Sequence, residues 1–298
     1  MARPGKDAAA AWPDGPLGLR EFRELVLAQG AAHGRPDLPW RYLDDPYAVL
    51  VSEVMLQQTQ VKRVLSYWPR FMEAFPDVAS LAGAPTSDVL GMWQGLGYNR
   101  RALALKRAAE ECAAKRGGEL PATYDGLVAL PGIGPATAAG VQAFARDLPG
   151  VYLETNVRSV FLHELFPGEE GVPDRVLAPL VGMACPDEGA REWYYALLDY
   201  GAYLKTRIAN PSRRSAGYSR QSGFAGSRRQ KRAELLRIVL DNPGTSLSGA
   251  HVLLNAAEED AGRAAVPPAL FESILGDLVA EGFFRRVGDG GPDDVLVP

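Results

Sequence analysis

The stretch that decides the fold runs from residue 130 to residue 140 and reads LPGIGPATAAG. Two glycines, Gly132 and Gly134, flank one apolar residue between two segments of helical periodicity, so the stretch predicts a tight hairpin joining two helices. The second helix then begins with free backbone N–H groups, which bind a phosphate together with the helix dipole. A simple helix–helix turn would account for the short motif equally well.

Helical periodicity extends in both directions from this hairpin. Between Leu19 and Leu204, apolar residues recur at three- and four-residue spacing, and alternation typical of strands is nearly absent. Asp45-Pro46 reads as an N-cap followed by proline at the first helical position. The sequence therefore predicts an all-α domain of many short helices, with helical segments at 46–58, 60–75, 87–93, 100–115, 123–130, 135–146, 157–166 and 190–205.

The pattern changes near the C-terminus. Three helices are predicted at 229–241, 247–257 and 268–281, followed by two short strands, Phe283 to Val287 and Asp294 to Val297. Three helices and a β-ribbon suggest a small winged-helix (α+β) domain. The predicted organisation is a disordered tail at 1–17, a helical domain at 18–210, a basic linker at 211–228 and the winged-helix-like domain at 229–298.

Composition limits the class of protein. The chain has 298 residues, 47% of them hydrophobic, and contains no apolar run near the roughly 18 residues that span a membrane. The N-terminal residues lack the apolar stretch of a secretory signal, so we expect a cytoplasmic, nucleoid-associated protein, monomeric and without a membrane partner. Cys112 and Cys185 have no Cys or His partner at metal-ligand spacing, so no zinc or iron–sulfur cofactor is expected.

The net charge of −4 conceals a basic segment. From Tyr200 to Ala233 there are nine Lys or Arg residues and no Asp or Glu. Such a segment can neutralise several phosphates of a nucleic acid. A solvated basic linker is the alternative interpretation.

Two carboxylates stand out as candidate catalytic groups. On a helix, Glu53 shares one face with Val49 and Leu56, and a carboxyl in an apolar stripe tends toward the raised pKa of a general acid. Glu154 precedes Asn156, the predicted N-cap of the next helix. Two such carboxylates suit glycosidic cleavage, one protonating the leaving group and one facing the cationic sugar. A buried Glu–Arg pair and simple helix-end electrostatics are the structural alternatives.

Four strings in register carry a family resemblance. SEVMLQQTQV, WQGLGY, LPGIGPATAAG and ETNVR occur in the order and spacing of the helix-hairpin-helix DNA glycosylases, with MutY-type adenine glycosylases as the most similar group. The resemblance covers about Leu19 to Lys205. It implies a fold of two α-helical lobes that hold double-stranded DNA and an extruded base in the cleft between them.

The resemblance also implies roles for individual residues. Glu53 matches the catalytic glutamate, Glu154 the catalytic aspartate, and Asn156 an asparagine that positions the sugar-side carboxylate. Leu38, Trp40 and Asp199 match positions at the adenine pocket, and Gln58 and Tyr98 match residues that wedge into the base stack. The other expected DNA contacts are Thr59, Leu96, Gly132, Gly134, Ala136, Thr137, Arg158, Arg213, Arg214 and Arg220.

The chain departs from the family pattern at four points. Glu154 is one methylene longer than the family's aspartate, and Ala136 stands where bifunctional relatives carry lysine, so strong AP-lyase activity is not expected. Residues 210–218 replace the four-cysteine iron–sulfur loop. The winged-helix-like segment replaces the family's C-terminal domain that reads 8-oxoguanine.

Three functions remain open from the sequence. The first is a monofunctional glycosylase acting on adenine opposite guanine or 8-oxoguanine. The second is a thymine/uracil mismatch glycosylase, and the third is a catalytically weak lesion-binding protein, motivated by Glu154. Because a pure binder has little need for a desolvated acid, Glu53 favours an enzyme.

Overall fold

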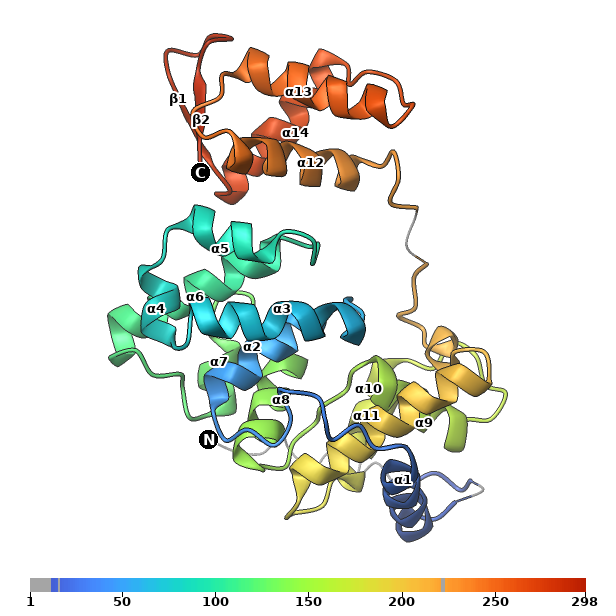
Figure 1. The fold of residues 1–298 in the computed structure, drawn as a ribbon. Helices are drawn as coiled ribbons and strands as arrows, with labels where there is room; N and C mark the ends of the chain where they lie inside the picture. Colours follow the sequence, from blue (N-terminus) through green and yellow to red (C-terminus); the bar gives the residue numbers. More distant parts are fainter. Residues whose placement is uncertain (1–11, 16, 221–222) are drawn as a thin grey trace. The chain divides into compact units, whose positions relative to one another are not determined.

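The structure is a computed structural model that describes residues 12–15, 17–220 and 223–298 (Figure 1). The chain divides into two compact units, each assembled from distant parts of the sequence. Their segments are Met1–Glu53, Pro121–Ala129 and Ile133–Arg220 for the first unit, and Val54–Leu120, Leu130–Gly132 and Gln221–Pro298 for the second. Most of the predicted tail 1–17 lies outside the described residues, but Trp12 packs with its ring 5.3 Å from that of Phe22.

The first unit is built around one long helix, α11 (Ala190–Arg207). It packs against α1 (Leu19–His33), α8 (Pro135–Arg146) and α9 (Thr155–Glu164), and Figure 1 shows α1 and α9 close to it. The buried faces are apolar; Phe22, for example, contacts the rings of Phe161 and Trp193. The unit is completed by the start of α2 (Pro46–Leu56), by α7 (Tyr124–Val128), α10 (Asp174–Ala184) and the 3-10 helix η1 (Pro211–Arg214).

The second unit contains the end of α2 and four further helices from the N-terminal half of the chain. Buried apolar residues of α6 (Arg100–Arg116) pack against α4 (Val78–Gly83) and α5 (Thr86–Trp93). Helix α3 (Val61–Ala74) packs on α5, with Phe71 against Trp93. These helices provide the base on which the loop at 94–99 is held.

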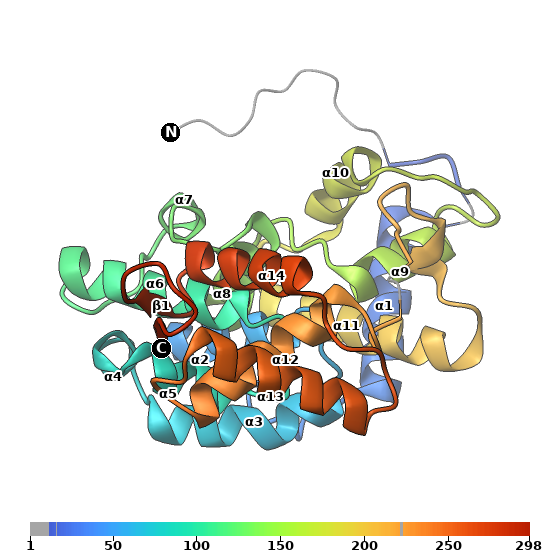
Figure 2. The ribbon, with the colours of Figure 1, turned by 90° about the horizontal axis from the view of Figure 1, so that it is seen from above.

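The C-terminal part of the second unit has the predicted order of elements. Helices α12 (Arg228–Asp241), α13 (Leu247–Asp260) and α14 (Pro268–Glu281) pack together, and both ribbon views show them side by side (Figures 1 and 2). Strands β1 (Arg285–Val287) and β2 (Val295–Val297) pair antiparallel, with Arg285 opposite Val297. The assignment of these elements to a winged helix stays a prediction.

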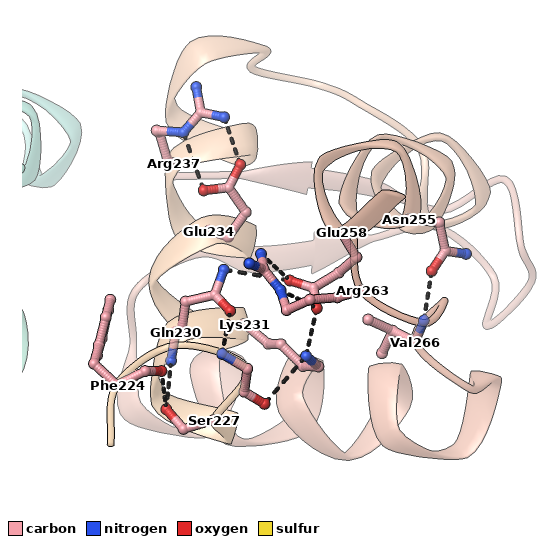
Figure 3. A network of polar contacts seen from close by, with 11 residues as sticks. Phe224, Ser227, Gln230, Lys231, Glu234, Arg237, Asn255, Glu258, Arg263 and Val266 are labelled. Atoms are coloured by element: carbon pink, nitrogen blue, oxygen red, sulfur yellow. Dashed lines mark hydrogen bonds and ion pairs between the residues drawn. The ribbon is translucent and has the colours of Figure 1, made fainter. Parts of the chain in front are cut away.

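One buried carboxylate ties this small domain together. Glu258, at the end of α13, accepts hydrogen bonds from Lys231 and Gln230 on α12 and from the guanidinium of Arg263 (Figure 3). These bonds hold the pKa of Glu258 at about 2. The buried carboxylate is therefore fully supplied with hydrogen-bond partners, as buried polar groups generally are.

The observed helices confirm the predicted all-α class. The predictions for 135–146 and 268–281 match α8 and α14, and the other predicted helices differ from the observed ones by at most three residues at either end. Helices α1, α4 and α10 lie in the region predicted to be helical, although no separate boundaries were predicted for them. None of the helices in the described ranges is long and apolar enough to cross a membrane.

The first part of the predicted linker 211–228 is packed rather than extended. Helix η1 lies against α9, Ser212 and Ser215 are buried, and Val172 forms a β-bridge with Ser215. The sequence signal for a linker there was the richness in Ser, Gly and Arg. In this part of the segment, Arg214 turns inward and donates to main-chain carbonyl oxygens.

Candidate active site

The carboxyl of Glu53 lies in the first unit between α8 and the loop that precedes α9. The hydroxyl of Tyr152 donates a hydrogen bond to its Oε2 atom at 3.0 Å. Burial raises the pKa of Glu53 to about 8; the Tyr152 hydrogen bond opposes the rise in pKa, and the charge of Glu154 reinforces it. Glu53 is therefore protonated near neutral pH, as the sequence predicted for a general acid.

A glycine on α8 makes room for this carboxyl. A Cβ atom at Gly140 would lie 2.4 Å from Oε2 of Glu53 and 3.0 Å from Cε2 of Tyr152. Gly140 is thus required because of a close approach, although it sits inside a helix, where glycine is unfavourable. The sequence motif at 130–140 contained this glycine without indicating its purpose.

Glu154 is the N-cap of α9, which corrects the prediction that Asn156 caps this helix. Its Oε1 atom accepts the backbone N–H groups of Asn156 at 2.6 Å and Val157 at 3.2 Å. Asn156 is already the second residue of the helix. The longer side chain explains the difference, because Glu154 reaches the free N–H groups from a position at which the preferred caps are shorter residues.

Lys205 contacts the start of α9 although the sequence did not single it out. Its Nζ donates to Oδ1 of Asn156 at 2.6 Å, and burial lowers the pKa of Lys205. An ammonium group only donates, so the amide oxygen of Asn156 faces Lys205 and its NH₂ group faces away. Gly201 allows this approach of α9 and α11, since a Cβ there would lie 2.3 Å from the carbonyl oxygen of Asn156.

The predicted base-pocket residues are brought together by an ion-pair cluster. Asp199 on α11 is 2% exposed, and its two carboxylate oxygens pair with the guanidinium of Arg41 at 2.7 Å each. Arg35 adds a 2.6 Å bond from Nε and a 3.1 Å bond from its backbone N–H. The cluster fixes the segment that carries Leu38, which is half-buried, and Trp40, which is buried. Asp199 is thus held by two arginines, and its contact with a base stays a prediction.

The two predicted wedge residues lie in the second unit and share an unusual backbone conformation. Gln58 and Tyr98 are exposed and have φ angles of 53° and 51°. Only four described non-glycine residues have positive φ, and a left-handed conformation costs such a residue about 1–2 kcal/mol. Both residues are therefore held at the surface in a strained geometry.

Arg101 holds both wedge segments. Its guanidinium donates to carbonyl oxygens at the end of α2 and in the loop at 94–98, and to the hydroxyl of Thr59 at 3.0 Å. The same group lies 5.5 Å from the ring centres of Trp93 and Tyr98, and burial lowers its pKa to about 10. No sequence motif indicated this residue, since its partners come from two separate segments.

The remaining predicted DNA contacts differ in exposure. In the first unit, Gly134 caps α8 with an ordinary φ of −84°, Ala136 is half-buried and Thr137 is buried. In the second unit, Gly132 is exposed with φ of 71°, whereas Leu96 is 3% exposed and belongs to the core. Contact of Leu96 with DNA would therefore have to use its main chain.

The predicted basic residues separate into paired and exposed ones. Arg158 forms two bonds of 2.8 and 2.7 Å with Asp174, and Arg214 is turned inward. Arg213 and Arg220 are exposed. The acceptors of the Arg214 guanidinium are the carbonyl oxygens of Leu162, Phe166 and Glu169.

The residues present do not fit an iron–sulfur cluster. Residues 210–218 contain no cysteine, and Cys112 and Cys185 are both buried free thiols. Within the ranges that the structure describes, no group of three or more His, Cys, Asp or Glu side chains is placed to hold a metal ion.

Comparison with known proteins identifies a common family. The family model described as HhH-GPD superfamily base excision DNA repair protein matches residues 51–177. The chain is 32% identical over 275 residues to the adenine DNA glycosylase of Mycolicibacterium smegmatis, and the aligned region covers 87% of this chain and 94% of the relative. It is 32% identical over 185 residues to that of Buchnera aphidicola subsp. Baizongia pistaciae, covering 61% of this chain and about half, 52%, of the relative.

A solved structure shares the fold. The structure of a thermostable thymine-DNA glycosylase matches with a TM-score of 0.57 and 22% identity over 65% of this chain and 90% of that chain. At this level of identity, the similarity concerns the fold alone.

Proposed function

The chain belongs to the HhH-GPD superfamily of base excision DNA repair proteins, with adenine DNA glycosylases as relatives, and we propose that it is a monofunctional DNA glycosylase that removes adenine opposite guanine or 8-oxoguanine. Its substrate is double-stranded DNA, and we expect it to act as a cytoplasmic, nucleoid-associated monomer. The observation that carries the proposal is the partly buried carboxyl of Glu53, whose pKa of about 8 keeps it protonated.

The proposed reaction uses the two carboxyl groups of the first unit in different protonation states. Glu53 gives its proton to the adenine ring as the bond between base and deoxyribose breaks, so that the bonding electrons leave with the base. The carboxylate of Glu154 faces the positive charge that develops on the sugar. Water then adds at C1′ and loses a proton, which leaves an abasic site.

The side chain of Glu154 supports both a structural and a catalytic use. The N-cap engages Oε1, so the second oxygen is left to face the sugar. The extra methylene, about 1.5 Å of reach, lets Oε1 accept both N–H groups from the N-cap position of α9. A competent site with glutamate at this position is therefore consistent with the local backbone.

The proposal is tested with a panel of duplexes that contain A opposite 8-oxoguanine, A·G, T·G and U·G. We expect alkali-labile sites in the adenine strand under single turnover, and none with Glu53→Gln. Cleavage confined to the T·G and U·G duplexes would replace adenine by pyrimidine as the substrate, and binding without cleavage of any duplex would favour a lesion-binding protein.

Monofunctional chemistry is a separate part of the proposal. A β-lyase needs an amine nucleophile, and Ala136 supplies none. Lys205 carries an amine in the same unit, but its Nζ donates a hydrogen bond to the side chain of Asn156. We expect little covalent adduct on borohydride treatment. A high yield that disappears in Lys205→Met would instead identify Lys205 as a lyase nucleophile.

A further inference from the structure

A tyrosine hydroxyl reaches the candidate general acid from the loop before α9. Tyr152 lies two residues before Glu154, and its hydroxyl is 3.0 Å from Oε2 of Glu53, which is 99 residues away in the sequence. One short loop thus contacts one carboxyl through Tyr152 and carries the other at Glu154. None of the four sequence strings assigned a role to the Tyr152 side chain.

The Tyr152 side chain is fixed on several sides. It is 5% exposed, and its ring packs edge-on against Phe144 at 5.1 Å and Tyr194 at 5.3 Å. Its backbone N–H donates to the hydroxyl of Tyr194, which in turn donates to the carbonyl oxygen of Gly150. The packing of the ring and the backbone hydrogen bond therefore hold the Tyr152 hydroxyl in a fixed position against Glu53.

We propose that Tyr152 is a positioning residue for catalysis: its hydroxyl engages Oε2 of Glu53 and leaves Oε1 as the oxygen that delivers the proton to the base. Close packing supports this division of the two oxygens. The Tyr152 hydroxyl lies 3.0 Å from Oε2, and a Cβ at Gly140 would lie 2.4 Å from the same oxygen, so α8 also packs closely against it. The inference rests on the proposed glycosylase function.

The hydrogen bond also sets the strength of the acid. Burial raises the pKa of Tyr152 well above 10, so the hydroxyl stays protonated and can only donate to a carboxylate at Oε2. Donation stabilises the charged form of Glu53 and counteracts the effect of burial on its pKa. Without Tyr152, Glu53 would hold its proton more tightly and transfer it less readily.

The test is the variant Tyr152→Phe, which keeps the ring packing and removes the hydroxyl. At pH 6 to 7 we expect the single-turnover rate to fall about tenfold, the effect of losing one buried hydrogen bond. At the same time, the pH at which the rate declines on the alkaline side should rise by about one unit, because the acid is weaker. A merely structural defect lowers the rate at every pH and leaves that midpoint in place.

The matched control is Tyr200→Phe. Tyr200 is also a buried tyrosine of the first unit that donates to a glutamate, but its acceptor is Glu164 rather than Glu53 or Glu154. Its removal should leave the alkaline midpoint unchanged. An unshifted midpoint in Tyr152→Phe would overturn the proposal.

A second readout does not depend on cleavage. Carbon-13 NMR of labelled glutamate carboxyls, assigned with Glu53→Gln, follows the titration of Glu53 directly. The proposal requires a higher pKa in Tyr152→Phe than in the native chain, and an equal or lower pKa refutes it. If no duplex is cleaved while this pKa shift is present, the proposed function fails and the contact between Tyr152 and Glu53 stands.

Discussion

Glu53 occupies a position that a residue selected for stability alone would not. Its carboxyl is partly buried, faces the negative charge of Glu154 and has a hydroxyl rather than a cation as its hydrogen-bond partner. The alternative predicted from sequence, a structural Glu–Arg pair, is not what the described residues show at this carboxyl. Asp199 is the acid that forms such a pair, with Arg41. Glu53 is thus distinguished from a structural acid such as Asp199 by its hydrogen-bond partner.

The raised pKa of Glu53 makes both activity and stability depend on pH. Its pKa is 4.5 in the unfolded chain and about 8 in the folded one, so stability from this group is fully present below pH 4.5 and is lost as pH rises to 8. The loss amounts to about 3 kcal/mol by pH 7. We expect Glu53→Gln to abolish cleavage, keep DNA affinity and melt several degrees higher than the native chain at pH 8.

Differential scanning calorimetry at pH 5 and pH 8, together with binding to an uncleaved duplex, checks this expectation. The stabilisation should be larger at pH 8 than at pH 5. A variant that keeps most of its single-turnover rate would show that Glu53 is not the general acid.

Glu154 combines a cap with a proposed charge, and two substitutions separate these uses. Glu154→Gln keeps an oxygen for the N–H groups of Asn156 and Val157 but removes the charge, so we expect little change in melting and a rate reduced by about 100-fold or more. Glu154→Asp keeps the charge but shortens the reach. It should not exceed the native rate. If Glu154→Gln cleaves at the native rate, the residue is only a helix cap.

Among the elements, the loop at 94–98 and the end of α2 depend on one guanidinium. Replacing Arg101 by Lys keeps the charge but cannot supply the fork of donors to Val54, Met55 and Gly97. We expect a loss on the order of 3 kcal/mol, as for other buried charged hydrogen-bond networks. Weaker DNA binding should follow, because Gln58 and Tyr98 lose the group that holds their left-handed backbone.

Thermal unfolding and binding to a lesion duplex measure both effects. The control is Arg63→Met. The exposed Arg63 side chain contacts the same loop through one hydrogen bond to the carbonyl oxygen of Gly95. Its effect should stay within about 0.5 kcal/mol. Equal effects of the two variants would show that Arg101 has no special role in this loop.

The basic segment contains residues of two kinds, and they should respond differently to neutralisation. The double variant Arg213→Ala, Arg220→Ala removes two exposed charges and should weaken binding to all duplexes alike, reducing the salt slope by about 2. Arg214→Ala removes an inward-facing group and should lower the melting temperature instead. An unchanged salt slope in the double variant would mean that the segment is a linker only.

The elements also show why sequence reasoning reached some features and not others. Helix α8 was predicted to the residue because Pro135 marks its beginning and its apolar pattern ends at Arg146. The start of α9 was placed late, because Asn156 is the preferred type of cap and Glu154 is not. The contact of Tyr152 with Glu53 and the fork of Arg101 join segments distant in sequence, so no local pattern contains them.

At the scale of the whole molecule, charge is divided unevenly along the chain. The segment from Tyr200 to Ala233 is wholly basic in its charged residues, whereas the residues from Glu258 to Pro298 include nine acidic and three basic ones. Several of the basic residues at the start of α12 are used inside the second unit; Arg228 and Arg232 pair with Asp277 on α14. Part of the positive charge of the C-terminal helices is therefore neutralised by ion pairs between these helices. This neutralisation disfavours them as the main DNA-binding surface.

The same internal pairing predicts that the C-terminal domain is sensitive to acid. Ion pairs to Arg263 and Lys231 hold the pKa of Glu258 at about 2, below the 4.5 of an unpaired glutamate. A lowered pKa contributes stability that is present above pH 4.5 and is lost as pH falls to 2. Unfolding of these helices should therefore become easier across that window, and Asp294 beside Arg286 shifts in the same direction.

Glu258→Gln tests this assignment, with Glu259→Gln as the matched control. Glu259 is the exposed neighbour on the same helix, so its neutralisation should change stability by no more than about 0.5 kcal/mol. Glu258→Gln leaves Lys231 and Arg263 without their carboxylate and should cost on the order of 3 kcal/mol at pH 7. Because the titrating group is gone, the variant should also lose less stability than the native chain between pH 4.5 and 2. Hydrogen exchange of α12 to α14 measures both effects on the stability of these helices. If the native chain and Glu258→Gln lost stability equally as the pH falls from 4.5 to 2, the buried carboxylate would not determine the acid sensitivity of the domain.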